Sequence, residues 1–154
     1  MEFRELIAEF AARVGVTESV VIDDENRCAF EIDGMGVIAQ GLDEVGVVSL
    51  LAFIAPPPPE RLERLYRRLL EANHLYRETF GATLSVDPET GMVCLVKHMP
   101  SATLDGEAFF REAELFTNVI AHWKAVVENF RDGPEDGERG VAADAPSEDF
   151  VIRG

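Results

Sequence analysis

Residues 60–99 constrain the fold of this chain more than any other stretch. Apolar side chains recur every three or four positions in residues 60–80, which predicts a helix with one apolar face: Leu62, Leu65, Tyr66, Leu69, Ala72 and Tyr76. Gly81 follows, where the left-handed backbone at a helix end favours glycine. The next residues, ATLSVD, alternate in polarity, and a DPETG turn separates them from a second strand-like run. The stretch therefore predicts a helix that leads into an antiparallel hairpin.

The rest of the chain supplies elements that would cover this unit. Apolar periodicity predicts a helix over residues 2–14 and a long final helix over about 105–130. Between the first helix and residue 55, a short β-branched run at 19–23 precedes strand patterns at 28–33, 37–42 and 46–55. We expect an α+β fold with an antiparallel twisted sheet of about five strands and three helices, in the order α-β-β-β-α-β-β-α. These elements form a single domain over residues 1–130 in this interpretation.

The charge and hydropathy of the chain limit the classes of partner that it can bind. The formal net charge is −15, which argues against nucleic acid, because binding to phosphates requires a basic surface. No apolar run has the roughly 20 residues needed for membrane insertion. The acidic first residues do not resemble a signal peptide, and Cys28 and Cys94 lie in apolar strand patterns that predict buried free thiols. We expect a cytoplasmic protein.

The last residues differ in composition from the rest. Residues 131–154 are rich in Gly, Pro, Asp and Glu and show no periodicity, which predicts a disordered acidic tail. The sequence leaves open whether this tail occupies a groove, tunes delivery of a partner or has no role.

Few residues suggest catalysis or a cofactor. His74, His98 and His122 show no zinc-site spacing, and the chain has no glycine-rich phosphate loop and no nucleophile with an evident base. Cys94 and His98 alternate onto one strand face, but a buried thiol and a histidine at a strand end explain them more simply. We therefore expect no enzyme activity, no metal and no cofactor.

Two strands carry more apolar residues than a single core requires. The runs GVVSLLAFIA and MVCLV are apolar on both faces, so one face of each can pack on helices while the other needs a second cover. A large exposed apolar surface usually marks a protein partner.

Residues 69–96, LLEANHLYRETFGATLSVDPETGMVCLV, resemble a signature of the class I type III secretion chaperones, the Tir-chaperone or CesT family. In that family a helix ending in LLxAN leads to a glycine, a short strand, a DPxTG-like turn and another strand. The last helix resembles the family's final helix, and the likeness extends from Phe3 to Phe130. The matching positions are Leu69, Leu70, Ala72, Asn73, Gly81, Leu84, Asp87, Gly91, Val93, Phe109 and Trp123.

The resemblance implies a function and places residues in it. Family members are cytoplasmic bacterial homodimers that bind the N-terminal segment of a secreted effector, keep it secretion-competent and deliver it to the secretion apparatus without ATP. Dimer contacts are expected from the middle helix and the strands after it, at Leu75, Val93 and Leu95. Effector contacts are expected from the first helix and neighbouring strands, at Phe3, Leu6, Phe10, Phe30, Ile32, Val48, Leu50 and Ala52.

Two other functions remain open at the level of the sequence. One is a dimeric adaptor or regulator on the same fold that binds a protein which is not secreted. The other is a small enzyme with a site around Cys94 and His98.

Overall fold

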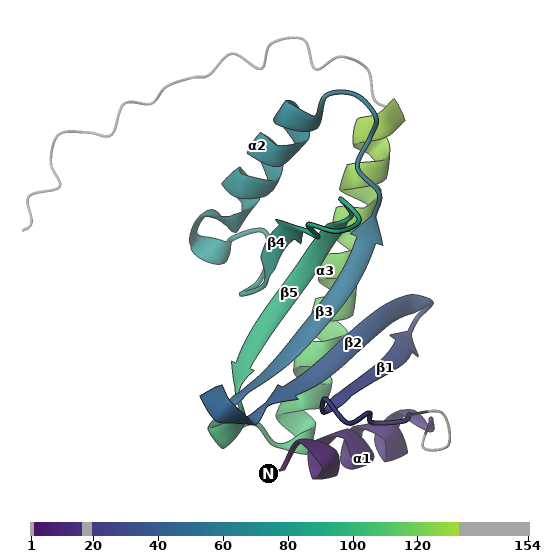
Figure 1. Cartoon of the computed structure of the whole chain (residues 1–154), viewed down its shortest axis with the longest axis vertical. Coiled ribbons are helices and arrows are strands. Elements are labelled where there is room, and N and C mark those ends of the chain that lie inside the picture. The colour runs from purple at the N-terminus through teal and green to yellow at the C-terminus, as the bar shows by residue number, and fades with distance from the viewer. Residues whose placement is uncertain (1, 17–19, 133–154) are drawn as a thin grey trace, which may run out of the picture.

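The computed structural model describes residues 2–16 and 20–132 and confirms the predicted fold class and order of elements (Figure 1). Three helices accompany one antiparallel sheet of five strands. The elements are α1 (Phe3–Val14), β1 (Arg27–Ile32), β2 (Met35–Leu42), β3 (Val47–Ala55), α2 (Leu62–Asn73), β4 (Thr83–Val86), β5 (Val93–Pro100) and α3 (Gly106–Asp132).

The strands lie in the order β1-β2-β3-β5-β4, so the strongly apolar β3 is central, and β1 and β4 form the two edges. The register aligns Ile38 of β2 with Leu51 of β3 and Val96 of β5 in one row across the sheet. Since side chains alternate between the faces along a strand, this register also decides which residues share a face.

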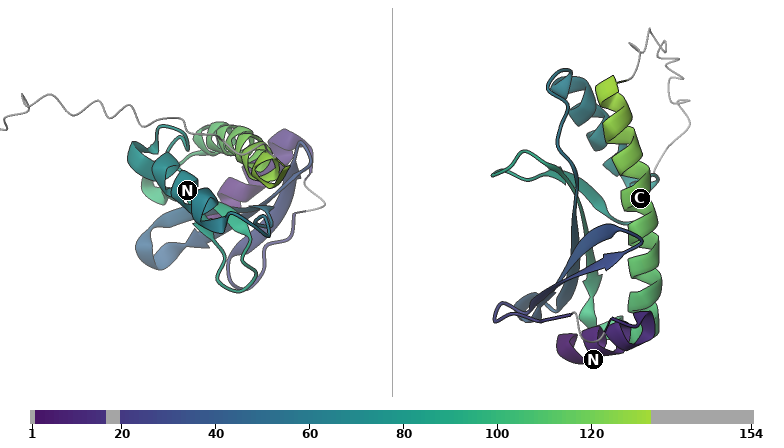
Figure 2. Two further views of the ribbon diagram at one scale, coloured as in Figure 1. Left: turned by 90° about the horizontal axis from the view of Figure 1, so that it is seen from above. Right: turned by 90° about the vertical axis from the view of Figure 1, so that its right-hand side faces the viewer.

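The long helix α3 runs along one face of the sheet, with α1 across its first turns and α2 beside its last turns (Figure 2). Apolar side chains recur along this helix at alternating spacings of four and three residues, and all but the last, the half-buried Phe130, are buried: Phe109, Ala113, Phe116, Ile120, Trp123 and Val127. At the α1 end, a Cβ atom on Gly41 of β2 would lie 2.7 Å from the ring of Phe3. Only glycine at this position lets α1 approach the sheet so closely.

Two predicted elements differ from the structure. The helix predicted over residues 60–80 ends at Asn73, and residues 74–81 form an irregular segment in which Leu75, Tyr76 and Phe80 have positive φ angles. Within the predicted strand at residues 19–23, Val20 and Ile22 are not in a strand; they pack against the core beside α1. The predicted tail falls, from residue 133 on, outside the described residues.

Asn73 ends α2 and fixes β4 at the same time. Its side-chain amide donates to the Leu84 carbonyl at 3.0 Å, and its Oδ1 accepts from the Leu84 amide at 2.8 Å. These two bonds replace the helical continuation that the apolar period alone would favour, because they satisfy part-buried backbone groups of a strand with only four residues.

We expect Asn73→Ala to lower the free energy of unfolding by about 2 kcal/mol, because it removes two hydrogen bonds and leaves the Leu84 amide unsatisfied. Chemical denaturation measures this change. The matched control is Asn118→Ala on the exposed side of α3, which should change the free energy by less than about 0.5 kcal/mol. An equal loss in the two variants would show that the Leu84 contact contributes nothing specific.

Candidate protein-interaction surfaces

Seven of the eight residues predicted to contact an effector form the interior of the chain. The ring of Phe10 lies 4.9 Å from that of Phe30 and 5.2 Å from that of Phe109, centroid to centroid, which joins α1, β1 and α3. The seven residues expose less than a tenth of their surface: Phe3, Leu6, Phe10, Phe30, Val48, Leu50 and Ala52. In the single chain they build the core beneath the surface and offer little contact area to a partner.

The described residues of the chain form three exposed apolar surfaces. The first is the face of the sheet that points away from α3. Ile38, Leu51 and Val96 form a half-buried row across three strands, and Phe53 beside them is 43% exposed. None of the three helices lies over this face (Figure 2). We call these four residues the open sheet face. The sequence showed that both faces of β3 are apolar, but only the register and the position of α3 reveal which set stays uncovered.

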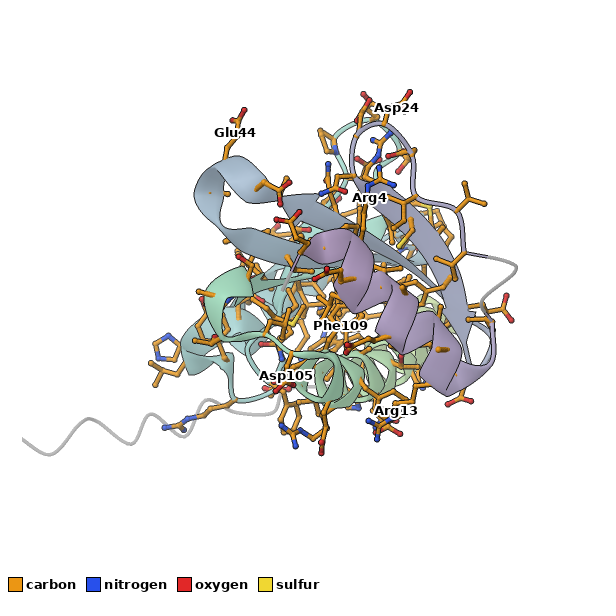
Figure 3. The ribbon with its side chains drawn as sticks, turned by 90° about the horizontal axis from the view of Figure 1, so that it is seen from below. Arg4, Arg13, Asp24, Glu44, Asp105 and Phe109 are labelled. Carbon is orange, nitrogen blue, oxygen red and sulfur yellow. The ribbon has the colours of Figure 1, made fainter. Side chains whose placement is uncertain are left out.

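A groove near the C-terminal end of α1 is the second surface. It has a volume of about 430 Å³, and its apolar wall comes from Phe10, Val14, Ile32 and Phe110. The guanidinium carbon of Arg13 lies 4.3 Å from the centre of the Phe110 ring, at the end of α1 that borders α3 (Figure 3). Ile32, the eighth residue predicted to bind an effector, is half-buried and lines this α1 groove, next to the outer edge of the sheet.

The third surface lies on α2 and the segment that follows it. Leu70 is 70% exposed and Leu75 is 65% exposed, which are high values for leucine. The members of this α2 surface are Leu62, Tyr66, Leu70, Leu75 and Tyr76.

Of the three residues predicted at a dimer interface, only Leu75 is on this surface. Val93 and Leu95 are fully buried within the chain. The sequence placed Leu62, Tyr66 and Tyr76 in the core stripe because their period matches it. Tyr66 is half-buried and packs against the core, whereas Leu62 is 38% exposed. The early end of α2 and the turn after it leave Tyr76 exposed instead.

Polar contacts hold the segment that presents Leu75. The Trp123 indole donates to the Glu78 carbonyl at 3.1 Å, and the Lys97 ammonium donates to the Phe80 carbonyl at 3.1 Å while it pairs with Glu112. Arg68 forms a two-pronged ion pair with the Glu78 carboxylate. The hydrogen bond from Arg68 holds the pKa of Glu78 below its usual value, with a smaller contribution from His122. These contacts fix the direction in which residues 74–81 face the solvent.

The comparison with known families decides what kind of protein carries these surfaces. The model of the Tir chaperone protein (CesT) family matches residues 5–124, which is most of the chain. The chain belongs to the Tir chaperone (CesT) family. The resemblance seen in the sequence is thereby confirmed.

Solved structures with a similar fold are protein–protein complexes, and those of HopA1–SchA and SycH are described as chaperone complexes. The similarity to the ExsC–ExsE complex has a TM-score of 0.68 with 26% identity, covering 80% of this chain and 91% of that one. For the HopA1–SchA chaperone–effector complex, the TM-score is 0.62 with 17% identity, covering 84% and 93%. The Yersinia pestis chaperone SycH, in complex with a fragment of YscM2, gives 0.62 with 16% identity, covering 82% and 99%.

One relative was found by sequence. The Chlamydia pneumoniae protein CPj0713/CpB0740 is 29% identical over 119 residues, which covers 77% of this chain and 90% of that protein.

In this CesT-family chain, the residues that carry the sequence signature have structural tasks. Leu69, Ala72 and Leu84 are buried, and Asn73 bonds to the backbone of β4. Asp87 accepts from the Thr90 amide at 2.9 Å and from the Thr90 hydroxyl, which closes the hairpin turn and lowers the pKa of the Asp87 carboxyl. These signature residues therefore specify the helix–hairpin unit, whereas the signature residue Leu70 is exposed and belongs to the α2 surface.

The residues considered for catalysis do not form a site. Cys94 and His98 are four residues apart on β5, which separates them by about 13 Å along an extended strand. Burial raises the pKa of the Cys94 thiol and raises that of Cys28 to about 11, the opposite of what activates a nucleophile. Within the described residues, no three potential ligands gather at a metal site, and no helix is long and apolar enough to cross a membrane.

Proposed function

We propose that this chain is a type III secretion chaperone that binds the N-terminal segment of a secreted effector as a homodimer in the bacterial cytoplasm. It keeps this segment soluble and extended and delivers the effector to the secretion apparatus, without catalysis and without a cofactor. The observation that carries the proposal is the CesT-family match over residues 5–124, together with the similarity in fold to a solved chaperone–effector complex. The three exposed apolar surfaces give the proposal its physical basis.

The open sheet face and the α1 groove are the proposed effector surfaces. The sheet face is apolar and the groove has an apolar wall with a polar rim. The edge strand β1 lies at the groove, where an extended segment can add to the sheet through main-chain hydrogen bonds. Acidic residues at the rim of the groove, Glu31, Asp33 and Glu114, favour an effector segment with basic residues between its apolar ones.

The α2 surface is the proposed dimer contact. It is apolar and exposed, and in a two-fold dimer each of its residues contributes to the interface once from each copy of the chain. The net charge of −15 keeps a chain with this much exposed apolar surface soluble.

A tagged pull-down from the native cytoplasm, with mass spectrometry of the bound protein, tests the function. We expect one larger secreted protein, bound through its N-terminal segment, with two chaperone chains for each effector. Phe53→Asp on the open sheet face, or Ile32→Asp in the α1 groove, should reduce capture at least about tenfold, because each buries a charge against the bound segment.

The matched control is Val45→Asp in the turn between β2 and β3, where the side chain is 69% exposed. This variant should capture the partner at the wild-type level. A clean dimer that binds nothing while secretion substrates are expressed would overturn the proposal. Capture of a protein that is not secreted would favour the adaptor interpretation instead.

A further inference from the structure

Residues 61–77, which include helix α2, are unusual in their charge as well as in their exposed leucines. In a chain with a net charge of −15, residues 61–77 contain five arginines and two glutamates, which gives this stretch a net charge of +3. Arg61 directly precedes the first turn of α2, and Arg64 and Arg68, four residues apart, lie on one side of the helix. We call these three residues the arginine flank.

The arginine flank lies toward the C-terminal end of α3. The guanidinium carbon of Arg68 is 5.1 Å from the centre of the Trp123 ring, and from Trp123 the helix continues for nine residues to Asp132. The first turn of α2 and the last turn of α3 lie at the same end of the molecule (Figure 1). The chain after α3 therefore begins close to the most basic part of the protein.

We propose that the acidic tail, residues 133–154, docks on the arginine flank of its own chain. The tail contains six acidic residues and two arginines, a charge opposite to that of the flank. Its first acids, Glu135, Asp136 and Glu138, come three to six residues after Asp132, a distance of roughly 10–20 Å in an extended chain. Helix α2 is about 18 Å long, so these acids reach its first two turns.

The docked tail leaves the α2 surface uncovered. The buried residues Leu65, Leu69 and Ala72 form the stripe of α2 that faces the core, and the arginine flank lies on one side of this stripe. Leu62, Tyr66 and Leu70 lie on its other side. The tail and a second copy of the chain can therefore bind α2 at the same time, and the tail proposal does not depend on any effector.

Energy transfer from Trp123 to a probe on the tail tests the proposal in the full chain. Trp123 is the only tryptophan, and Ala142→Cys adds a reactive thiol in the tail. The native Cys28 and Cys94 are buried with raised pKa values, so a dansyl-type thiol reagent labels the added cysteine first. We expect the transfer efficiency to fall at least about twofold between about 0.01 M and about 1 M salt, where the screening length drops from about 30 Å to about 3 Å.

Charge reversal identifies the docking site. Arg61→Glu with Arg64→Glu should reduce the transfer at low salt to its high-salt value, and the added changes Glu135→Arg and Asp136→Arg should restore it. The control pair, Arg4→Glu with Arg111→Glu, changes the net charge equally at the far end of the molecule and should leave the transfer unchanged. A transfer efficiency that does not change with salt concentration, or that falls equally in the control pair, would overturn the proposal.

Discussion

Leu75→Asp is expected to convert the proposed dimer into a monomer. The side chain is 65% exposed on the α2 surface, and at a two-fold interface the substitution removes two leucines and introduces two charges. Losing the burial of each leucine costs about 1.5–3 kcal/mol, so the dissociation constant should rise by at least about a hundredfold. Light scattering at a fixed protein concentration should then give half the wild-type mass.

The fold itself should tolerate this change. Leu75 has a φ angle of 56°, a left-handed conformation that aspartate adopts more readily than leucine. Circular dichroism should therefore remain that of the wild type. Val45→Asp introduces the same charge at a residue of nearly equal exposure and should remain dimeric. An unchanged mass for Leu75→Asp would place the dimer contact elsewhere.

Phe10→Ala is expected to have the largest effect on stability. The Phe10 side chain is fully buried and packs against the Phe30 and Phe109 rings. Truncating a buried phenylalanine costs about 3–5 kcal/mol, which should lower the melting temperature by roughly 10 °C or more for a domain of this size. Differential scanning calorimetry measures the shift, at one protein concentration for all variants because dimerisation also affects it.

Phe53→Ala serves as the matched control, since it removes the same atoms from a side chain that is 43% exposed on the open sheet face. It should cost less than about 1.5 kcal/mol and reduce effector capture instead. If Phe10→Ala melted at the wild-type temperature and failed only in effector binding, Phe10 would be a contact residue, as the sequence interpretation placed it.

The difference between the buried Phe10 and the exposed Phe53 also explains how far the sequence could predict the interaction surfaces. The order of the elements follows from periodicity and turn residues, and the structure confirms it. The effector residues were assigned from the family resemblance to the first helix and neighbouring strands, but Val48, Leu50 and Ala52 of β3 alternate with Leu51 and Phe53, which are equally apolar. The two faces of this strand are equivalent until α3 covers one of them, and that choice depends on packing between elements far apart in the chain.

The early end of α2 has a similar cause. The helical period continues through Tyr76, so local pattern favours a longer helix. The bonds that end it involve Leu84, Lys97 and Trp123, and none of these is near Asn73 in sequence. The exposure of Leu75 follows from these tertiary bonds, although its position off the apolar stripe was already visible in the sequence.

The contact between Asn73 and Leu84 also makes the two edges of the sheet unequal. Leu84 is in the edge strand β4, and its amide and carbonyl, which pair with the Asn73 side chain, would otherwise offer a template to an incoming strand. The amide group of Asn73 thus occupies the place of a neighbouring peptide and closes this edge. The edge at β1 has no such substitute among the described residues beyond Arg27, which bonds to Asp23. A segment that adds to the sheet as a further strand is therefore directed to the β1 edge, whatever side chains it carries.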